Sequence, residues 1–119
     1  MKDCKTIIHK GKTIVIVDFA DTTPAEAILI MEDAKKIIAK LPLKSALVLT
    51  DGTDAIYNRD SANALREFTS HNTPYIKASA AVGAEGLLAV LQQAMIFFTK
   101  REIKAFKDRE EALNWLAEH

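Results

Sequence analysis

Four consecutive apolar residues, Ile14-Val15-Ile16-Val17, restrict the fold of this chain more than any other segment. A strand with one face in water alternates apolar and polar residues, and this run does not alternate. We therefore expect a strand that is covered on both faces and lies inside a sheet between helices. Residues 4–10 have a second strand pattern, and Gly11 separates the two runs, where a tight turn favours a residue without a Cβ atom. The chain is thus expected to begin with a β-hairpin.

The rest of the sequence alternates between helix and strand patterns. The segment Thr23-Pro24-Ala25-Glu26 combines a capping threonine, a proline at the first helical position and a glutamate three residues after the cap. It predicts a helix that runs to about Lys40. Apolar spacing predicts further helices over residues 60–69, over residues 84–99 and after Asp108. Strand patterns occupy residues 45–50, 76–82 and 103–106.

The order of these elements predicts the fold class. Two strands are followed by helices and strands in alternation, which gives the order β-β-α-β-α-β-α-β-α. Such alternation builds an α/β fold with a single mixed, mostly parallel five-stranded sheet and four helices. A chain of 119 residues has the usual length of one domain, so we expect residues 1–119 to form a single domain.

Composition excludes several classes of function. Sixteen Lys and Arg balance sixteen Asp and Glu, so the chain has no overall field that would concentrate nucleic acid. Cys4 is the single cysteine, which rules out an internal disulfide and favours a reducing compartment. No apolar run reads as a signal peptide or a membrane span. We expect a cytoplasmic protein that neither binds nucleic acid nor inserts stably into a membrane.

Several segments resemble a known family. Residues 46–51, leading to Asp60-Ser61 at a helix start, resemble the corresponding part of a STAS domain, and the similarity covers nearly the whole chain. Stand-alone bacterial STAS-like proteins related to anti-sigma factor antagonists are similar through residues 77–83, 98–99, 103–106 and 109–116. The resemblance implies a non-enzymatic regulatory or protein-interaction module. The CRAL-TRIO domains that carry lipids have a similar fold, which leaves a carrier of a small apolar ligand as the alternative.

The resemblance also indicates a phosphorylation or partner site at Asp60 and Ser61. In signalling STAS domains a partner kinase phosphorylates the first serine of an Asp-Ser-Ser-Gly motif, and the dephosphorylated protein binds that kinase. The segment Asp60-Ser61-Ala62-Asn63 has neither the second serine nor the glycine. A phosphate on Ser61 would lie at a helix N-terminus, which receives anions well. The alternative interpretation is that Asp60 is an N-cap and Ser61 a first-turn residue; on this basis we expect weak or no phosphorylation.

Two of the predicted helices carry more apolar residues than one buried stripe requires. Ile28 and Leu29 fall outside the stripe of the first helix, and Ile96 and Phe97 fall outside that of the third. Adjacent exposed apolar residues of this kind mark partner or ligand surfaces. The hypothesis is a homodimer, or an apolar-ligand groove between the third helix and the sheet. The alternative is that neighbouring helices or the hairpin bury these residues, so that they form no binding surface.

No catalytic constellation is visible. Asp18, Asp21, Asp51 and Asp54 lie at or just after the ends of predicted strands, where α/β sheets place their sites. A response-regulator receiver domain begins with a single strand and needs a lysine after its last strand. This chain begins with a hairpin instead, and its Lys107 stands before Asp108 in the context of a helix cap. The sequence also lacks a nucleophile elbow and a phosphate-binding glycine loop. We expect no enzyme, no metal site and no cofactor.

Overall fold

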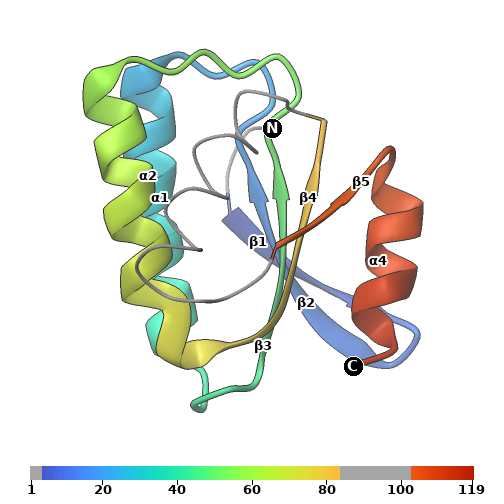
Figure 1. Ribbon diagram of the computed structural model, residues 1–119. Helices are drawn as coiled ribbons and strands as arrows, with labels where there is room; N and C mark the ends of the chain where they lie inside the picture. The colour runs from blue at the N-terminus through green and yellow to red at the C-terminus, as the bar shows by residue number, and fades with distance from the viewer. Residues whose placement is uncertain (1–3, 84–102) are drawn as a thin grey trace.

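The computed structural model describes residues 4–83 and 103–119 (Figure 1). The strands are β1 (Cys4–His9), β2 (Lys12–Asp18), β3 (Ala46–Asp51), β4 (Ile76–Val82) and β5 (Lys104–Phe106). The helices are α1 (Pro24–Ala39), α2 (Arg59–Asn72), the short 3₁₀ helix η1 (Thr73–Tyr75) and α4 (Arg109–Ala117). The described part therefore holds three α-helices where the sequence predicted four, because the helix predicted over residues 84–99 lies outside the described residues.

The strands form one mixed five-stranded sheet in the order β1-β2-β3-β4-β5. β1 and β2 pair antiparallel, and the other neighbours pair parallel. The predicted hairpin and the mostly parallel sheet are thus confirmed. Each described strand also lies beside the strand that comes before it in the chain.

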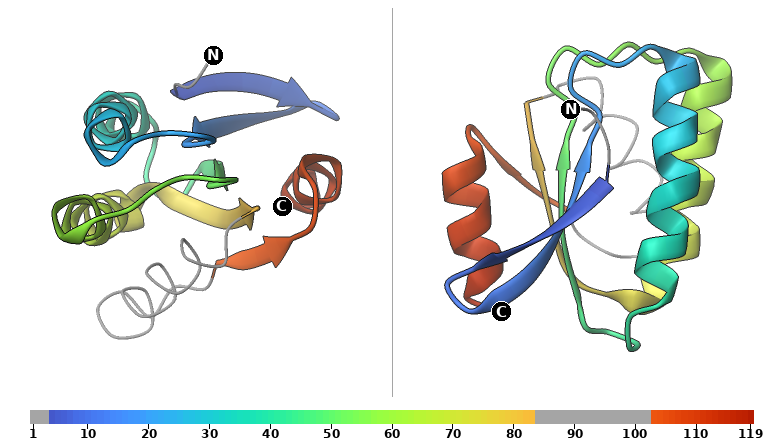
Figure 2. Two further views of the ribbon diagram at one scale, coloured as in Figure 1. Left: turned by 90° about the horizontal axis from the view of Figure 1, so that it is seen from above. Right: turned by 180° about the vertical axis from the view of Figure 1, so that it is seen from behind.

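The helices cover the two faces of the sheet unequally. α1 and α2 pack side by side on one face, and α4 lies on the opposite face (Figures 1 and 2). The strand order explains why α1 and α2 share a face. Right-handed crossovers from β2 to β3 and from β3 to β4 advance in the same direction along the sheet, so both place their helix on the same side.

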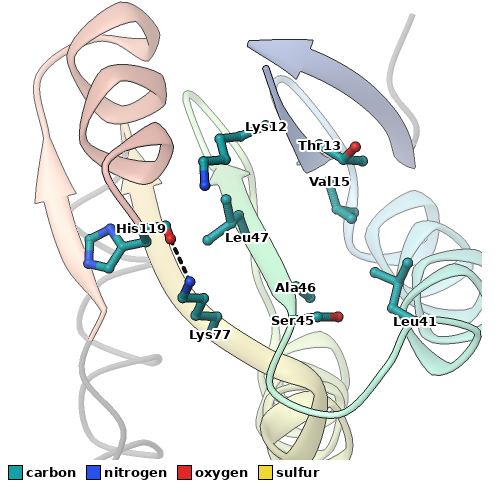
Figure 3. Close-up of a pocket in the computed structure, with 9 residues that line it drawn as sticks. All are labelled: Lys12, Thr13, Val15, Leu41, Ser45, Ala46, Leu47, Lys77 and His119. Atoms are coloured by element: carbon teal, nitrogen blue, oxygen red, sulfur yellow. Dashed lines mark hydrogen bonds between the residues drawn. The ribbon is translucent and has the colours of Figure 1, made fainter. Parts of the chain in front are cut away.

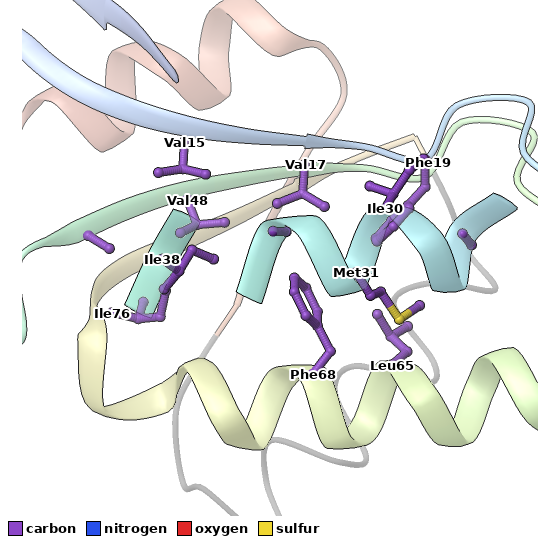
Figure 4. Packing of buried hydrophobic residues seen from close by; sticks show 13 residues of the cluster. Val15, Val17, Phe19, Ile30, Met31, Ile38, Val48, Leu65, Phe68 and Ile76 are labelled. Atoms are coloured by element: carbon purple, nitrogen blue, oxygen red, sulfur yellow. The ribbon is translucent and has the colours of Figure 1, made fainter. Parts of the chain in front are cut away.

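The apolar run in β2 has side chains in both layers of the core. Val15 and Val17 pack between the sheet and the two long helices, in a cluster that includes Phe68 of α2 (Figure 4). Ile14 and Ile16 face the other layer and belong to a cluster with Leu116 of α4. All four residues of the run are buried. The absence of alternation in the sequence is thus explained, and the prediction of a strand covered on both faces is confirmed.

The predicted helix starts of α1 and α4 are also confirmed. The side chain of Thr23 accepts a hydrogen bond from the Glu26 amide at 3.3 Å, and the Glu26 carboxylate accepts one from the Thr23 amide at 2.9 Å. In α4 the Asp108 carboxylate accepts from the Glu111 amide at 2.9 Å. Local side-chain chemistry therefore fixes where both helices begin.

Candidate functional site

The carboxyl ends of β2 and β3 place two aspartates side by side. Asp18 and Asp51 are register partners in the parallel pairing of the two strands. Arg109, the first residue of α4, reaches both carboxylates. Its Nε donates to Oδ2 of Asp51 at 2.7 Å, and its Nη2 lies 3.0 Å from Oδ2 of Asp18. One guanidinium group thus joins the last residues of two strands to the helix on one face of the sheet.

The remaining oxygens of these carboxylates are also occupied. Oδ1 of Asp18 accepts from the Ala20 amide at 2.9 Å. Oδ1 of Asp51 accepts from the amide of Thr53 at 3.0 Å and from its hydroxyl at 2.7 Å. Burial alone would raise the pKa of Asp51, but the hydrogen bonds from Thr53 and Arg109 outweigh burial and hold this pKa below its ordinary value. Asp51 is therefore ionised at neutral pH, and it shares the single positive charge of Arg109 with Asp18.

The four aspartates that the sequence placed at strand ends do not form one cluster. Asp18 and Asp51 meet through Arg109, whereas Asp21 and Asp54 are exposed residues of the loops that follow. Residues 4–83 and 103–119 contain no group of three or more His, Cys, Asp or Glu that could hold a metal ion. The paired carboxylates brace the loops and α4 rather than offer open oxygen ligands.

Main-chain hydrogen bonds hold these loops together at the same edge of the sheet. The Asp21 amide donates to the Thr53 carbonyl at 2.9 Å, and the Ile56 amide donates to the Thr22 carbonyl at 3.0 Å. Gly83, at the end of β4, packs against Thr53 with a φ of 77°. A Cβ at this glycine would stand 1.9 Å from the Thr53 hydroxyl oxygen, so the close approach requires glycine.

Tyr57 anchors the loop between β3 and α2 to the core. Burial raises the pKa of its hydroxyl well above the ordinary value, and the charge of Asp51 raises it further. The hydroxyl oxygen is buried and has no hydrogen-bond partner among the described residues. Tyr57 is therefore neutral and holds the loop through its ring.

The start of α2 contains both residues of the predicted phosphorylation site. Oδ1 of Asn58 accepts from the Ser61 amide at 2.8 Å, and Oγ of Ser61 accepts from the Asn58 amide at 2.8 Å. Ser61 is 0% exposed, whereas Asp60 is exposed. The interpretation of Asp60 as the N-cap is wrong, because the helix begins at Arg59 and the extended cap conformation belongs to Asn58. The spacing of Asn58 and Ser61, three residues apart, was the signal in the sequence for this reciprocal cap.

The predicted apolar surface is described only in part. Leu29 is 63% exposed on α1, and its neighbour Ile28 is partly buried. Ile96 and Phe97 lie outside the described residues, as does the helix that was to form one wall of the predicted ligand groove. Sequence reasoning missed Ile56, which is 63% exposed in the loop before α2. The only sign of this exposed residue in the sequence was a large aliphatic side chain between two polar loop segments.

Comparisons with known proteins give one match. A family model described as SpoIIAA-like matches residues 5–117. No curated protein and no solved structure matches the chain. Within residues 4–83 and 103–119, no helix is long and apolar enough to cross a membrane.

Proposed function

Because the chain belongs to the SpoIIAA-like family, we propose that it is a cytoplasmic regulatory module that binds another protein, as anti-sigma factor antagonists do, and carries out no catalysis. The exposure of Ile56 is the observation that carries this proposal. Its side chain is 63% exposed on a loop that is fixed at both ends. A large aliphatic residue on a rigid loop suits an interface anchor, since binding then orders little of the chain.

Hydrogen bonds hold the loop in one conformation. The Ala55 amide donates to the Gly52 carbonyl at 3.1 Å, and the Ile56 amide is bound by the loop before α1. Tyr57, the residue after Ile56, packs against the core. Ile56 is therefore presented by a preorganised turn rather than by a free segment.

Exposed charged residues lie close to this anchor along the chain. We define the loop surface as Asp54, Ile56, Arg59 and Asp60, all of which are exposed. An apolar centre with a polar rim is the usual anatomy of a protein interface, in which the rim contributes more to specificity than to affinity. The loop surface therefore suits a partner with an apolar pocket and charges of both signs around it.

The binding surface operates without a phosphate on Ser61. The Ser61 hydroxyl is buried and accepts the hydrogen bond that caps α2. A kinase would have to open the first turn of the helix to reach it, which would break the cap. We propose that partner binding is constitutive at this surface, and that an anti-sigma-type kinase of the same cell is the first candidate partner.

Photo-crosslinking tests the proposal. A photoreactive residue is placed at Ile56, and a control is placed at Leu43, which is 69% exposed in the loop after α1. In the cell of origin, position 56 should capture one defined protein and position 43 should not. Equal capture at both positions, or none at position 56, contradicts the proposal.

The captured protein is then titrated with purified variants. We expect Ile56→Asp to weaken binding by about tenfold or more, because a charge replaces a desolvated anchor. Leu43→Asp should bind like the unsubstituted protein. Circular dichroism confirms that both variants are folded, so wild-type affinity of Ile56→Asp would refute the loop surface.

A further inference from the structure

A pocket opens at the amino-terminal edge of the sheet, at the opposite end of the strands from the loop surface. Its volume is about 320 Å³, and it lies between the beginnings of β2 and β3 (Figure 3). Small-molecule sites in proteins begin at about this size. Nothing in the function proposed above uses this pocket.

The pairing of the strands explains the opening. The parallel pairing of β2 with β3 begins at Ile14 and Leu47. The two residues before Ile14 pair instead with β1, since Lys12 lies opposite His9 in the hairpin. On the other side, the Ser45 amide donates to the Tyr75 carbonyl at 3.1 Å, which ties the start of β3 toward β4. The two strand starts therefore diverge and leave the pocket between them.

The pocket combines an apolar wall with a cationic rim. Leu41, which follows α1, and Val15 form an apolar wall on the α1 side of the sheet, and Leu47 lies in the layer under α4. Lys12 and Lys77 form the rim, and their side chains lie on either side of Leu47 (Figure 3). Lys77 Nζ donates to the main-chain oxygen of His119. No Asp or Glu is among the lining residues.

Further charged residues near the pocket add to its positive charge. Lys10 and Lys44 are exposed in the turns directly before lining residues. The nearest acidic side chain along the chain is that of Glu118, which is exposed beside His119. The aspartates of the site described above lie at the other end of the strands. An anion entering here therefore meets a local excess of positive charge, although the chain as a whole has a net charge of +0.

We propose that this pocket binds a small amphiphilic acid, with its anionic head between Lys12 and Lys77 and its short aliphatic body against Leu41 and Val15. The two ammonium groups select the charge of the head. The apolar wall favours a ligand with a hydrocarbon portion over a simple inorganic anion. The lysine stems widen the apolar contact while their charged ends stay in water.

Amide NMR spectra of nitrogen-labelled protein test the proposal with three probes that share a chain length: octanoate, octanol and octylammonium. Octanoate should cause saturable shifts of the amides of Thr13, Ser45 and Lys77, and added salt should weaken its binding. Octanol should bind about tenfold more weakly and octylammonium not at all. Equal binding of octanol and octanoate, or no saturable shift with octanoate, overturns the proposal. Inorganic phosphate binding as tightly as octanoate overturns the amphiphilic part.

Matched variants locate the site. Lys12→Gln should weaken octanoate binding by about fivefold, the effect of losing one partly exposed ion pair. Lys44→Gln, which removes a neighbouring lysine that does not line the pocket, should leave the affinity unchanged. Leu41→Ser should weaken binding while Leu43→Ser should not. Equal effects of Lys12→Gln and Lys44→Gln would assign the binding to general surface charge and refute the site. Because Ile56 is at the other edge of the sheet, either proposal can fail alone.

Discussion

Arg109 is the side chain that connects the strand ends to α4, and its loss should be costly at neutral pH. We expect Arg109→Gln to lower the free energy of unfolding by about 1–2 kcal/mol, because two adjacent carboxylates lose their shared charged donor. The pKa of Asp51 is lower in the folded protein than in the unfolded chain. This carboxylate therefore stabilises the fold above pH of about 4, and the contribution is lost as pH falls through the folded pKa.

Urea unfolding followed by the fluorescence of Trp115, the single tryptophan, measures this effect. The difference in unfolding free energy between the wild type and Arg109→Gln should be largest at neutral pH and shrink in acid. In Asp51→Asn, the unfolding free energy should lose the part of its pH dependence that comes from protonation of this carboxylate. A difference that stays constant from neutral to acidic pH would contradict the role given to this ion pair.

Ser61 is expected to carry no phosphate in the cell. Its hydroxyl is 0% exposed and its oxygen caps α2 together with Asn58. Intact-mass measurement of protein isolated from its own cell, with and without phosphatase treatment, checks this expectation. Stoichiometric phosphate on Ser61 would contradict it and would mean that the first turn of α2 opens readily.

α4 contributes to the core through a narrow stripe of side chains. Leu116 is 0% exposed beneath the helix, whereas Leu113 is only partly buried. We expect Leu116→Ala to lower the free energy of unfolding by about 3 kcal/mol, since it leaves a cavity against the sheet. Leu113→Ala is the matched control and should cost about 1 kcal/mol. If urea unfolding gives similar losses of free energy for the two variants, α4 does not pack through this narrow stripe.

Elements whose signals are local were predictable from the sequence. The capping box of α1 and the Asp108 cap of α4 each lie within four residues, and the apolar run of β2 indicates its own position in the sheet. The cap of α2 was missed because Asn58 and Asp60 both suit an N-cap, and the backbone of the preceding loop decides between them. The helix start was thus predicted to within one residue, but the role of Ser61 in it was not.

The candidate site depends on contacts that no local pattern reveals. Arg109 is separated from Asp51 by 58 positions, and only the completed sheet brings the two together. The exposure of Ile56 likewise follows from how its loop is tied to the start of α1. The lysine-rimmed pocket exists because two strand starts diverge. Each of these features is a property of the assembled fold.

Association of whole molecules was predicted from Ile28, Leu29, Ile96 and Phe97, of which the structure describes the first two, and this stays a prediction. Native mass spectrometry of freshly purified protein should give the mass of a dimer, or of a monomer with an added apolar ligand. Leu29→Asp should weaken self-association by about tenfold or more, because it places a charge in an apolar contact. Leu43→Asp is the control. A bare monomer for the unsubstituted protein would contradict both forms of the hypothesis.

The strand order β1-β2-β3-β4-β5 has a consequence for biosynthesis. A ribosome releases the N-terminus first, so the β1–β2 hairpin can form before any other strand has emerged. Every later strand of the described sheet then meets a finished edge made by its immediate predecessor, and none has to wait for a distant segment to be translated. The nascent chain can thus assemble its sheet by adding one strand at a time to a growing template.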